Sequence, residues 1–185
     1  MNKIKLTEII AMSFYKAHTD IKAGPYTHHW FKGGRGSTKS SFISIEIALG
    51  IMKDATKGEF TNAVIFRRVK DTLRGSVFEQ MLWAIEKLQC QNEWDINYSP
   101  LKLTYKPTGQ VILFKGADKP LKMKSIKVSK GYIKYIWYEE ADEFEGMEKI
   151  RNINQSVMRG GKKFIVFYSF NPPKSSKSWV NEELM

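Results

Sequence analysis

Short apolar runs separated by polar segments predict four buried strands in this chain. They cover residues 28–31, 62–68, 133–138 and 163–170, and they are rich in β-branched and aromatic side chains. Three further strands are predicted at residues 95–98, 101–105 and 110–114. The Lys-Pro-Thr-Gly sequence at 106–109 predicts a turn, so the last two strands should form an antiparallel hairpin.

Apolar residues at helical spacing predict helices at residues 6–18, 42–52, 72–88 and 147–158, with a loop at 20–26. Within 42–52 the alternation of Ile43, Ile45 and Ile47 also resembles a strand, but the position directly after a glycine-rich segment favours a helix. Strands that alternate with helices predict an α/β fold with a mostly parallel central sheet flanked by helices.

The segment at 32–41, KGGRGSTKSS, joins the first predicted strand to the second predicted helix. A triphosphate needs backbone N–H groups that converge on its oxygens, and a glycine-rich turn allows the chain to wrap that closely. The predicted phosphate-binding residues are Gly33, Gly34, Arg35, Gly36, Ser37, Thr38, Lys39, Ser40 and Ser41. Lys39 would place a charge on the outer phosphates, and the Ser40 hydroxyl would reach a magnesium ion.

Thr38 departs from the pattern GxxxxGK[ST], which has a second glycine at this position. A β-branched residue holds an ordinary negative φ but not the conformations open to glycine, so either the loop is built slightly differently or the segment is not a phosphate-binding loop. Taken alone, the segment is equally compatible with a glycine-rich surface turn and a solvated lysine.

Two acids, Glu139 and Glu140, come directly after the predicted strand at 133–138. In a nucleotide hydrolase, one carboxylate at a strand tip holds magnesium and the next orients and deprotonates the attacking water. We therefore assign Glu139 to the metal and Glu140 to the water. Asp142 and Glu143 are expected to cap and begin the following helix. The alternative is an acidic helix start on the surface.

A third polar segment, Asn171-Pro172-Pro173, follows the strand predicted at 163–170. A polar side chain at the end of a strand beside the acid-bearing strand could sense the γ-phosphate. The two prolines would stiffen the exit, so that a movement of Asn171 is transmitted along the chain.

Basic residues form two groups along the chain. Each group is either a functional surface or a solvated surface without a specific role. Arg67, Arg68, Lys70 and Arg74 would lie where the strand at 62–68 ends, which is the functional edge of an α/β sheet. The second group would be a DNA-facing loop or a solvated connection, and it contains Lys115, Lys119, Lys122, Lys124, Lys127 and Lys130.

Composition narrows the class of protein. The 185 residues are 42% hydrophobic and carry a net charge of +11, which suits one ordinary domain with a polyanionic partner such as nucleic acid. Cys90, the single cysteine, excludes an internal disulfide and a multi-cysteine metal site. His28 and His29 would point to opposite faces of a strand, which disfavours a metal site there. Neither a secretion signal nor a membrane-spanning run is apparent.

Together these motifs resemble the ATPase part of the large terminase subunit of tailed bacteriophages, in which GGRGS-x-KSS, W-x-EEA and SFNPP-type segments occur in this order. The resemblance covers roughly residues 30–179, including FRRVKDTLRGSVFE. It implies a P-loop domain of the additional-strand type that hydrolyses ATP with Mg²⁺ and pumps double-stranded DNA into a preformed capsid. It also implies a ring on the portal protein, a small terminase subunit as partner, and the cytoplasm of the bacterial host.

By this resemblance, Lys39 and Ser40 are the Walker A lysine and serine, and Glu139 and Glu140 are the Walker B pair. Arg35 matches an arginine that stabilises transition-state charge, a role that a neighbouring subunit could also supply. The coupling motif would comprise Ser169, Asn171 and Pro172.

Some features of the family are missing from this sequence. We expect residues 1–185 to be an ATPase domain without its final part and without the nuclease domain that usually follows. No glutamine-bearing adenine motif precedes Trp30, and Glu139 replaces the aspartate common in P-loop enzymes. Two alternatives remain, namely another nucleic-acid translocase and a non-hydrolysing DNA-binding or assembly module.

Overall fold

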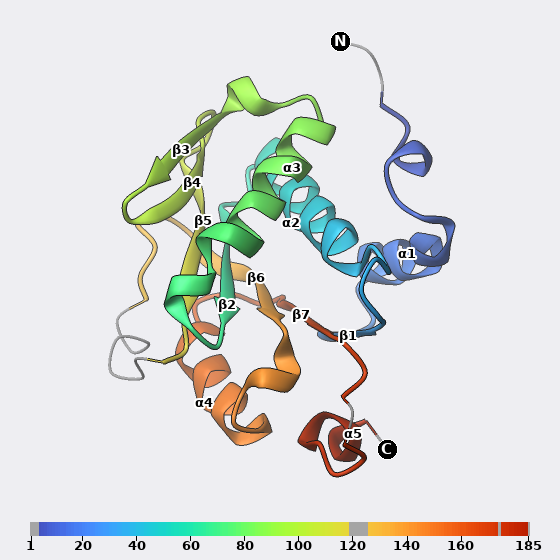
Figure 1. The fold of residues 1–185 in the computed structure, drawn as a ribbon. Coiled ribbons are helices and arrows are strands. Elements are labelled where there is room, and N and C mark those ends of the chain that lie inside the picture. Colours follow the sequence, from blue (N-terminus) through green and yellow to red (C-terminus); the bar gives the residue numbers. More distant parts are fainter. Residues whose placement is uncertain (1–3, 119–125, 174, 185) are drawn as a thin grey trace.

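A seven-stranded sheet forms the centre of the fold in this computed structural model, which describes residues 4–118, 126–173 and 175–184 (Figure 1). The strand order is β1-β7-β6-β2-β5-β4-β3. The strands are β1 (His28–Lys32), β2 (Thr61–Arg67), β3 (Trp94–Tyr98), β4 (Leu101–Tyr105), β5 (Gln110–Gly116), β6 (Tyr132–Glu139) and β7 (Ile165–Phe170).

Strands β1, β7, β6, β2 and β5 run parallel to one another, whereas β4 pairs antiparallel with both β5 and β3. This confirms the predicted α/β fold with a mostly parallel sheet, and it confirms the antiparallel hairpin of β4 and β5. The carboxyl ends of the five parallel strands therefore meet at one edge of the sheet, here called the carboxyl edge. The opposite edge is called the amino edge.

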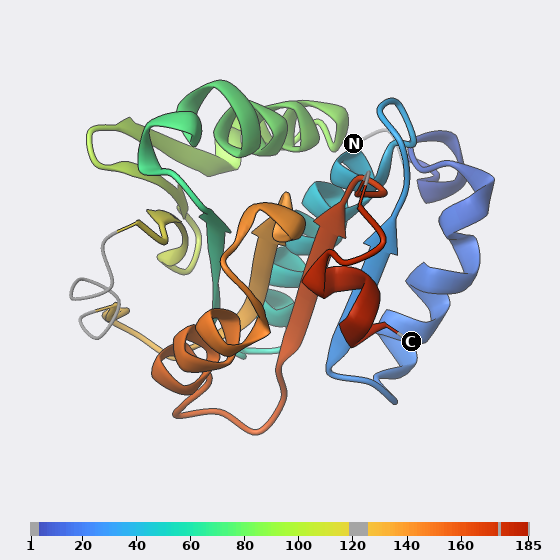
Figure 2. The ribbon, with the colours of Figure 1, turned by 60° about the horizontal axis from the view of Figure 1, so that its bottom comes forward.

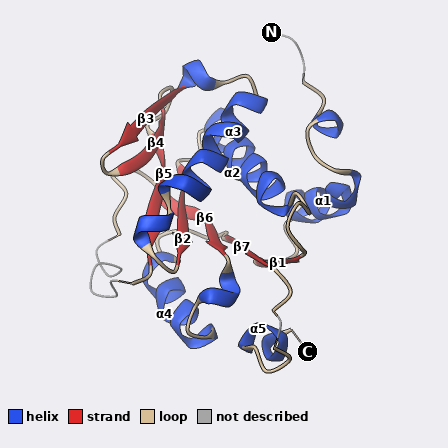
Figure 3. Cartoon of the chain, in the orientation of Figure 1, coloured by secondary structure: helices blue, strands red, loops and turns tan. Residues whose placement is uncertain are grey.

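Helices cover both faces of the sheet (Figures 2 and 3). One face packs against α1, α2 and α3, and the other against α4 and α5. Successive residues of β2 divide between the two cores, since Ile65 faces the first and Phe66 the second. Burial of both faces explains why these strands read as continuous apolar runs. The helices are α1 (Tyr15–Ala23), α2 (Lys39–Thr56), α3 (Glu79–Lys87), α4 (Met147–Val157) and α5 (Trp179–Glu183).

In the described part of the chain, no helix has the length and apolarity needed to cross a bilayer.

The N-terminal segment is not the single helix predicted for residues 6–18. Two 3-10 turns, Leu6–Glu8 and Met12–Phe14, precede α1, and Ala11 between them is extended. Ile10 is nevertheless buried, so the apolar pattern marked the core positions while tertiary packing set the backbone. Helix α1 then continues to Ala23, and Gly24 ends it at a φ of 74°.

Two other predicted helix starts are also wrong. A π-helical turn, Arg74–Phe78, precedes α3, and the Ser76 hydroxyl donates there to the Thr72 carbonyl (2.6 Å). Asp142 and Glu143 do not cap α4. They lie in a separate 3-10 turn, because the chain bends at Gly146, whose φ of 145° suits glycine, before α4 begins.

Candidate nucleotide-binding site

The glycine-rich loop joins β1 to α2 at the carboxyl edge of the sheet. The Gly33 N–H donates to the Phe170 carbonyl (3.2 Å), which ties the loop to the end of β7. A Cβ added to Gly33 would lie 2.7 Å from Ser37 Oγ, so a side chain at this position would force Ser37 to shift. Gly36 has a left-handed φ of 77°. The sequence prediction of a tight turn before a helix is therefore confirmed.

Thr38 adopts a left-handed conformation, with φ 58° and ψ 12°, immediately before α2. The expectation that its β-branched side chain would keep the loop at negative φ is wrong. Its carbonyl accepts the Phe42 N–H (2.9 Å) in the first turn of α2, which holds the backbone in place. Such a conformation costs a β-branched residue on the order of 1–3 kcal/mol, and residues held this way cluster at functional sites.

Lys39 turns its ammonium group back over the loop. Its Nζ donates to the Gly33 carbonyl (2.9 Å) and to Asn171 Oδ1 (3.0 Å). Partial burial lowers the pKa of Lys39, and the negative charge of Glu139 opposes that shift. The ammonium group is thus held by neutral oxygens at the place where the loop could present it to an anion.

Glu139 ends β6 and points toward the start of α2. Its Oε1 accepts the Ser40 hydroxyl (3.4 Å), and burial raises the pKa of its carboxyl group against the opposing charge of Arg67. Glu140 follows at a left-handed φ of 51° and is more exposed than Glu139. Two of the three non-glycine residues with positive φ in the described chain, Thr38 and Glu140, therefore belong to this site.

Arg67, at the end of β2, binds both acids. Its Nε lies 3.2 Å from Glu139 Oε2, and its Nη2 forms an ion pair with Glu140. Its other terminal nitrogen donates to the Thr72 carbonyl (3.3 Å). The sequence placed Arg67 at the functional edge, but the double pairing was not predicted.

One oxygen of Glu139 is left without a hydrogen bond among the described residues. Oε2 is buried, and the nearby Arg67 Nε is close enough for an ion pair but not aligned to donate. A buried carboxylate oxygen of this kind, beside the Ser40 hydroxyl, is a hard oxygen donor set that fits Mg²⁺.

Strand β7 brings the third predicted segment to the same place. Ser169 lies opposite Glu139 in the pairing of β6 with β7, and its hydroxyl accepts the buried Trp137 indole N–H (2.9 Å). Asn171 follows the end of β7 and accepts a hydrogen bond from Lys39. Pro172 is exposed beyond it.

These groups surround a cleft of about 220 Å³. Its lining contains most of the predicted residues together with Phe170, which the sequence did not single out: Arg35, Gly36, Lys39, Ser40, Glu139, Glu140, Ser169, Phe170 and Asn171. The predicted residues Gly33, Gly34, Ser37, Thr38 and Ser41 belong to the loop and the first turn of α2 without lining the cleft.

Of the predicted basic residues, Arg67 lies at the carboxyl edge of the sheet, and several others lie on the surface. Arg68, Lys70 and Arg74 are exposed, and the Arg74 guanidinium lies 5.3 Å from the centre of the Tyr98 ring. Lys130 stacks on the Phe60 ring instead of standing free. Lys119, Lys122 and Lys124 fall outside the described residues.

Solved structures that share this α/β fold include large terminases and a terminase ATPase domain. The large terminases of a thermophilic bacteriophage and of bacteriophage HK97 each superpose with a TM-score of 0.64, at 13% and 16% identity. They match 93% and 91% of this chain, which correspond to 39% and 34% of theirs. The ATPase domain of Thermus phage P74-26 large terminase matches 94% of this chain and 89% of that domain, with a TM-score of 0.55 and 14% identity.

This chain belongs to the phage terminase large subunit family, whose profile matches residues 26–185. The large terminase subunit of Bacillus phage SPP1 is 40% identical over 98% of this chain and 43% of its own length. The PBSX phage terminase large subunit of Bacillus subtilis strain 168 is 35% identical over 67% of this chain and 27% of its own length. The chain thus spans less than half the length of these relatives.

Proposed function

We propose that residues 1–185 form the ATPase domain of a packaging motor that hydrolyses ATP with Mg²⁺ and drives double-stranded DNA into a procapsid. The observation that carries the proposal is the convergence on one cleft of Lys39 and Ser40 from the start of α2 with Glu139 from the end of β6. Support also comes from the family, and from the large terminase of the thermophilic bacteriophage, whose structures were solved with ADP and with ATP-γ-S.

The loop and the start of α2 would hold the phosphates. Backbone N–H groups of residues 33–41 and the N-terminal end of α2 favour an anion, and Lys39 would exchange its contacts with loop carbonyls for phosphate oxygens. Ser40 and Glu139 would hold Mg²⁺, which neutralises charge on the phosphates when it is bound. Arg35 lines the cleft and is exposed, so it could reach the transferred phosphate from this subunit.

Glu140 is the proposed base. A carboxylate orients a water molecule and accepts its proton through a free lone pair. Arg67 pairs with Oε2 of Glu140, which leaves Oε1 to act on the water. Asn171 accepts a hydrogen bond from Lys39, and this bond would break when phosphate binds Lys39. Asn171 would then move, and Ser169 and Pro172 would transmit the movement to β7 and to the chain that follows it.

The whole protein's partners follow from the family and extend beyond this chain. We propose double-stranded DNA, the portal protein and the small terminase subunit as partners, with several copies in a ring. The site of action would be the cytoplasm of the bacterial host. We propose that residues 1–185 supply the ATPase domain and not the nuclease domain expected of such proteins.

The test is calorimetric titration of Mg-ATP into the native chain and into Lys39→Ala. Loss of the charge-assisted contacts, about 1.5–3 kcal/mol, should weaken ATP binding roughly 10- to 150-fold while urea unfolding stays unchanged. Lys87→Ala, on the exposed end of α3, is the matched control and should bind as the native chain does. Equal affinity in native and Lys39→Ala chains would remove the assignment.

A second measurement separates the motor from another DNA translocase. ATP turnover is measured in the presence of duplex DNA alone and, separately, in the presence of prohead and portal components, and the two rates are compared. The packaging motor requires the latter for full turnover. Full stimulation by any DNA would favour a general translocase, and DNA binding that ignores ATP would favour an inert DNA-binding module.

A further inference from the structure

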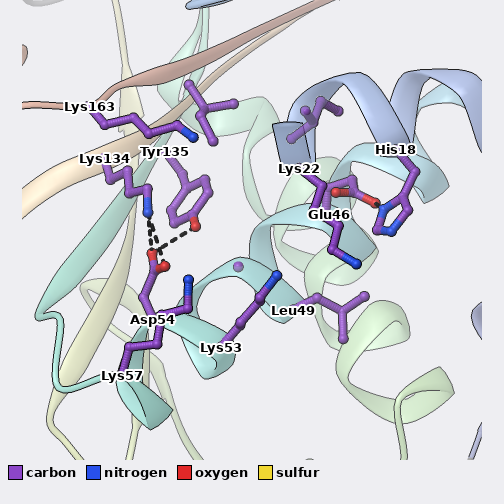
Figure 4. Close-up of a pocket in the computed structure, with 13 residues that line it drawn as sticks. His18, Lys22, Glu46, Leu49, Lys53, Asp54, Lys57, Lys134, Tyr135 and Lys163 are labelled. Carbon is purple, nitrogen blue, oxygen red and sulfur yellow. Dashed lines mark hydrogen bonds and ion pairs between the residues drawn. The ribbon is translucent and has the colours of Figure 1, made fainter. Parts of the chain in front are cut away.

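A pocket at the amino edge of the sheet gathers lysines from several elements (Figure 4). It has a volume of about 310 Å³ and lies between α1, the second half of α2 and the beginnings of β6 and β7. We call it the lysine pocket, after the five lysines that line it: Lys22, Lys53, Lys57, Lys134 and Lys163.

The two carboxylates in the wall of the lysine pocket already have partners. Asp54 accepts hydrogen bonds from Lys134 (2.8 and 2.9 Å), from the Tyr135 hydroxyl (2.8 Å) and from the Thr61 hydroxyl (2.7 Å). Glu46 is bonded to the His18 ring (2.6 Å). Asp54 is therefore matched by Lys134, whereas the charge of Glu46 still acts on Lys53.

Four lysine ammonium groups of the pocket form no ion pair within the described chain. Among the described residues, no ion pair involves Lys22, Lys53, Lys57 or Lys163, and all four side chains are exposed. Figure 4 shows the ends of Lys53 and Lys57 rising from α2 toward the space below Tyr135. Like charges gathered in this way repel one another unless an anion lies between them.

The ends of two helices account for part of this charge. Lys22 and Lys53 lie in the last turns of α1 and α2, where a cation offsets the helix dipole. Each helix end carries roughly half a negative charge, so the two ends balance about one of the four ammonium groups. With Glu46 counted as well, about two positive charges remain uncompensated around the pocket.

The floor of the pocket is rigid. Tyr135 crosses α2 at Gly50, where an added Cβ would lie 2.5 Å from the tyrosine ring, and it reaches Asp54 beyond. Asp54 and Lys134 are both buried. A fixed floor below a rim of long, mobile cations is a preformed concave site and not a random cluster of surface lysines.

We propose that the lysine pocket binds phosphate groups. Lysine binds phosphate as a point charge without the planar geometry that arginine imposes, and several ammonium groups together match a multiply charged anion. The phosphate could belong to a small free anion or to the backbone of duplex DNA. The pocket lies at the opposite edge of the sheet from the ATP cleft, so the proposal does not depend on ATP hydrolysis.

The test is an NMR titration of the whole chain with sodium pyrophosphate and, separately, with a 20-base-pair duplex of about two helical turns. Methyl signals of Ile21, Leu49 and Ile165 report the lysine pocket, whereas the Gly36 amide reports the ATP cleft. The variant Lys53→Gln/Lys57→Gln should weaken the pyrophosphate response of the pocket methyl groups about tenfold, because two nearby charges are lost.

The matched control is Lys5→Gln/Lys87→Gln, which removes the same charge from exposed sites outside the pocket. It should leave the pocket response unchanged. For the duplex, the pocket variant should also reduce the slope of log affinity against log salt by about 2, one for each lost phosphate contact.

Each result has a defined meaning. Pocket shifts with pyrophosphate support a free phosphate as ligand, and shifts with the duplex alone support backbone phosphates. No pocket shift with either probe would overturn the proposal, as would equal losses in the two double variants. Shifts at Gly36 alone would leave the ATP cleft supported and the lysine pocket rejected.

Discussion

The two edges of the sheet each bury a carboxylate beside a cation, yet they complete the arrangement differently. At the amino edge, Asp54 receives hydrogen bonds from Lys134, Tyr135 and Thr61. At the carboxyl edge, Glu139 has one 3.4 Å contact with Ser40, and its second oxygen has no hydrogen bond within the described chain. The first carboxylate has its hydrogen bonds supplied by the fold, whereas the second has an ion pair with Arg67 but an oxygen that still lacks a hydrogen bond from the described residues.

Backbone strain follows the same division. Thr38 and Glu140 hold left-handed conformations at the carboxyl edge, and the carbonyl of each accepts an N–H from the turn that follows it. Asp54 and Tyr135 lie in regular helix and strand. The comparison teaches that a carboxylate whose hydrogen bonds are all satisfied stabilises the fold. A carboxylate with an unsatisfied oxygen, beside strained backbone, is typical of a binding site.

The largest expected effect comes from breaking the saturated network. Asp54→Ala leaves the buried Lys134 with only the exposed Glu59, 3.7 Å away, as an acidic partner among the described residues, and we expect a loss of about 3–5 kcal/mol in the free energy of unfolding. Urea denaturation measures the change. Glu148→Ala, at an exposed site on α4, should change stability by less than about 0.5 kcal/mol.

The network can also be removed without leaving a buried charge. The double variant Asp54→Leu/Lys134→Met should regain most of the stability that Asp54→Ala loses, since no charge stays unpaired. A loss below about 1 kcal/mol in Asp54→Ala would contradict the view that this pair anchors the fold.

Glu139 should respond in the opposite direction. Burial raises the pKa of Glu139 above its ordinary value, so the ionised group destabilises the folded chain at neutral pH. Protonation removes this cost as the pH falls through the raised pKa. Glu139→Gln should therefore raise the free energy of unfolding at pH 7, and the gain should disappear in acid below the ordinary glutamate pKa.

The measurement is chemical denaturation of both chains between pH 7 and about pH 4, near the ordinary glutamate pKa. Glu148→Gln, at an exposed position, serves as the control and should show no such trend. A stability gain for Glu139→Gln that grows as the pH falls would show that the sign is wrong.

The smallest expected effect concerns the strained loop. Thr38→Gly removes the strain of a β-branched residue in a left-handed conformation. Glycine also gives the unfolded chain more freedom, so the net gain in the free energy of unfolding should be no more than about 1 kcal/mol. ATP affinity should remain within about twofold of the native value, a change of about 0.4 kcal/mol. Thermal unfolding and calorimetry measure the two quantities. A large loss of affinity would show that the Thr38 side chain itself contributes to the site.

Much of the fold could be predicted because burial dictates it. Apolar runs covered by helices on both faces marked β2, β6 and β7, and their order along the chain predicted that Lys39, Glu139 and Asn171 would meet at one edge. The segment at 6–18 was mispredicted, because its apolar residues reach the core through an extended break that periodicity does not encode.

The missing parts of the site depend on contacts between distant residues. Arg67 meets Glu139 and Glu140 from a different strand, and no local pattern encodes that pairing. The left-handed φ of Thr38 contradicts its intrinsic preference and is imposed by the loop closure around it. The Asp54 network likewise joins α2 to β6 and is invisible to sequence periodicity.

The most direct test of the account is Mg-dependent ATP turnover by this chain beside Glu140→Gln and the exposed control Glu148→Gln, with ATP binding measured for all three. We predict that Glu140→Gln lowers turnover by a factor on the order of 10² or more while ATP binding and the control stay near native. Native turnover in Glu140→Gln, or a native chain that does not bind ATP, would contradict the assignment of the carboxyl edge as an ATPase site.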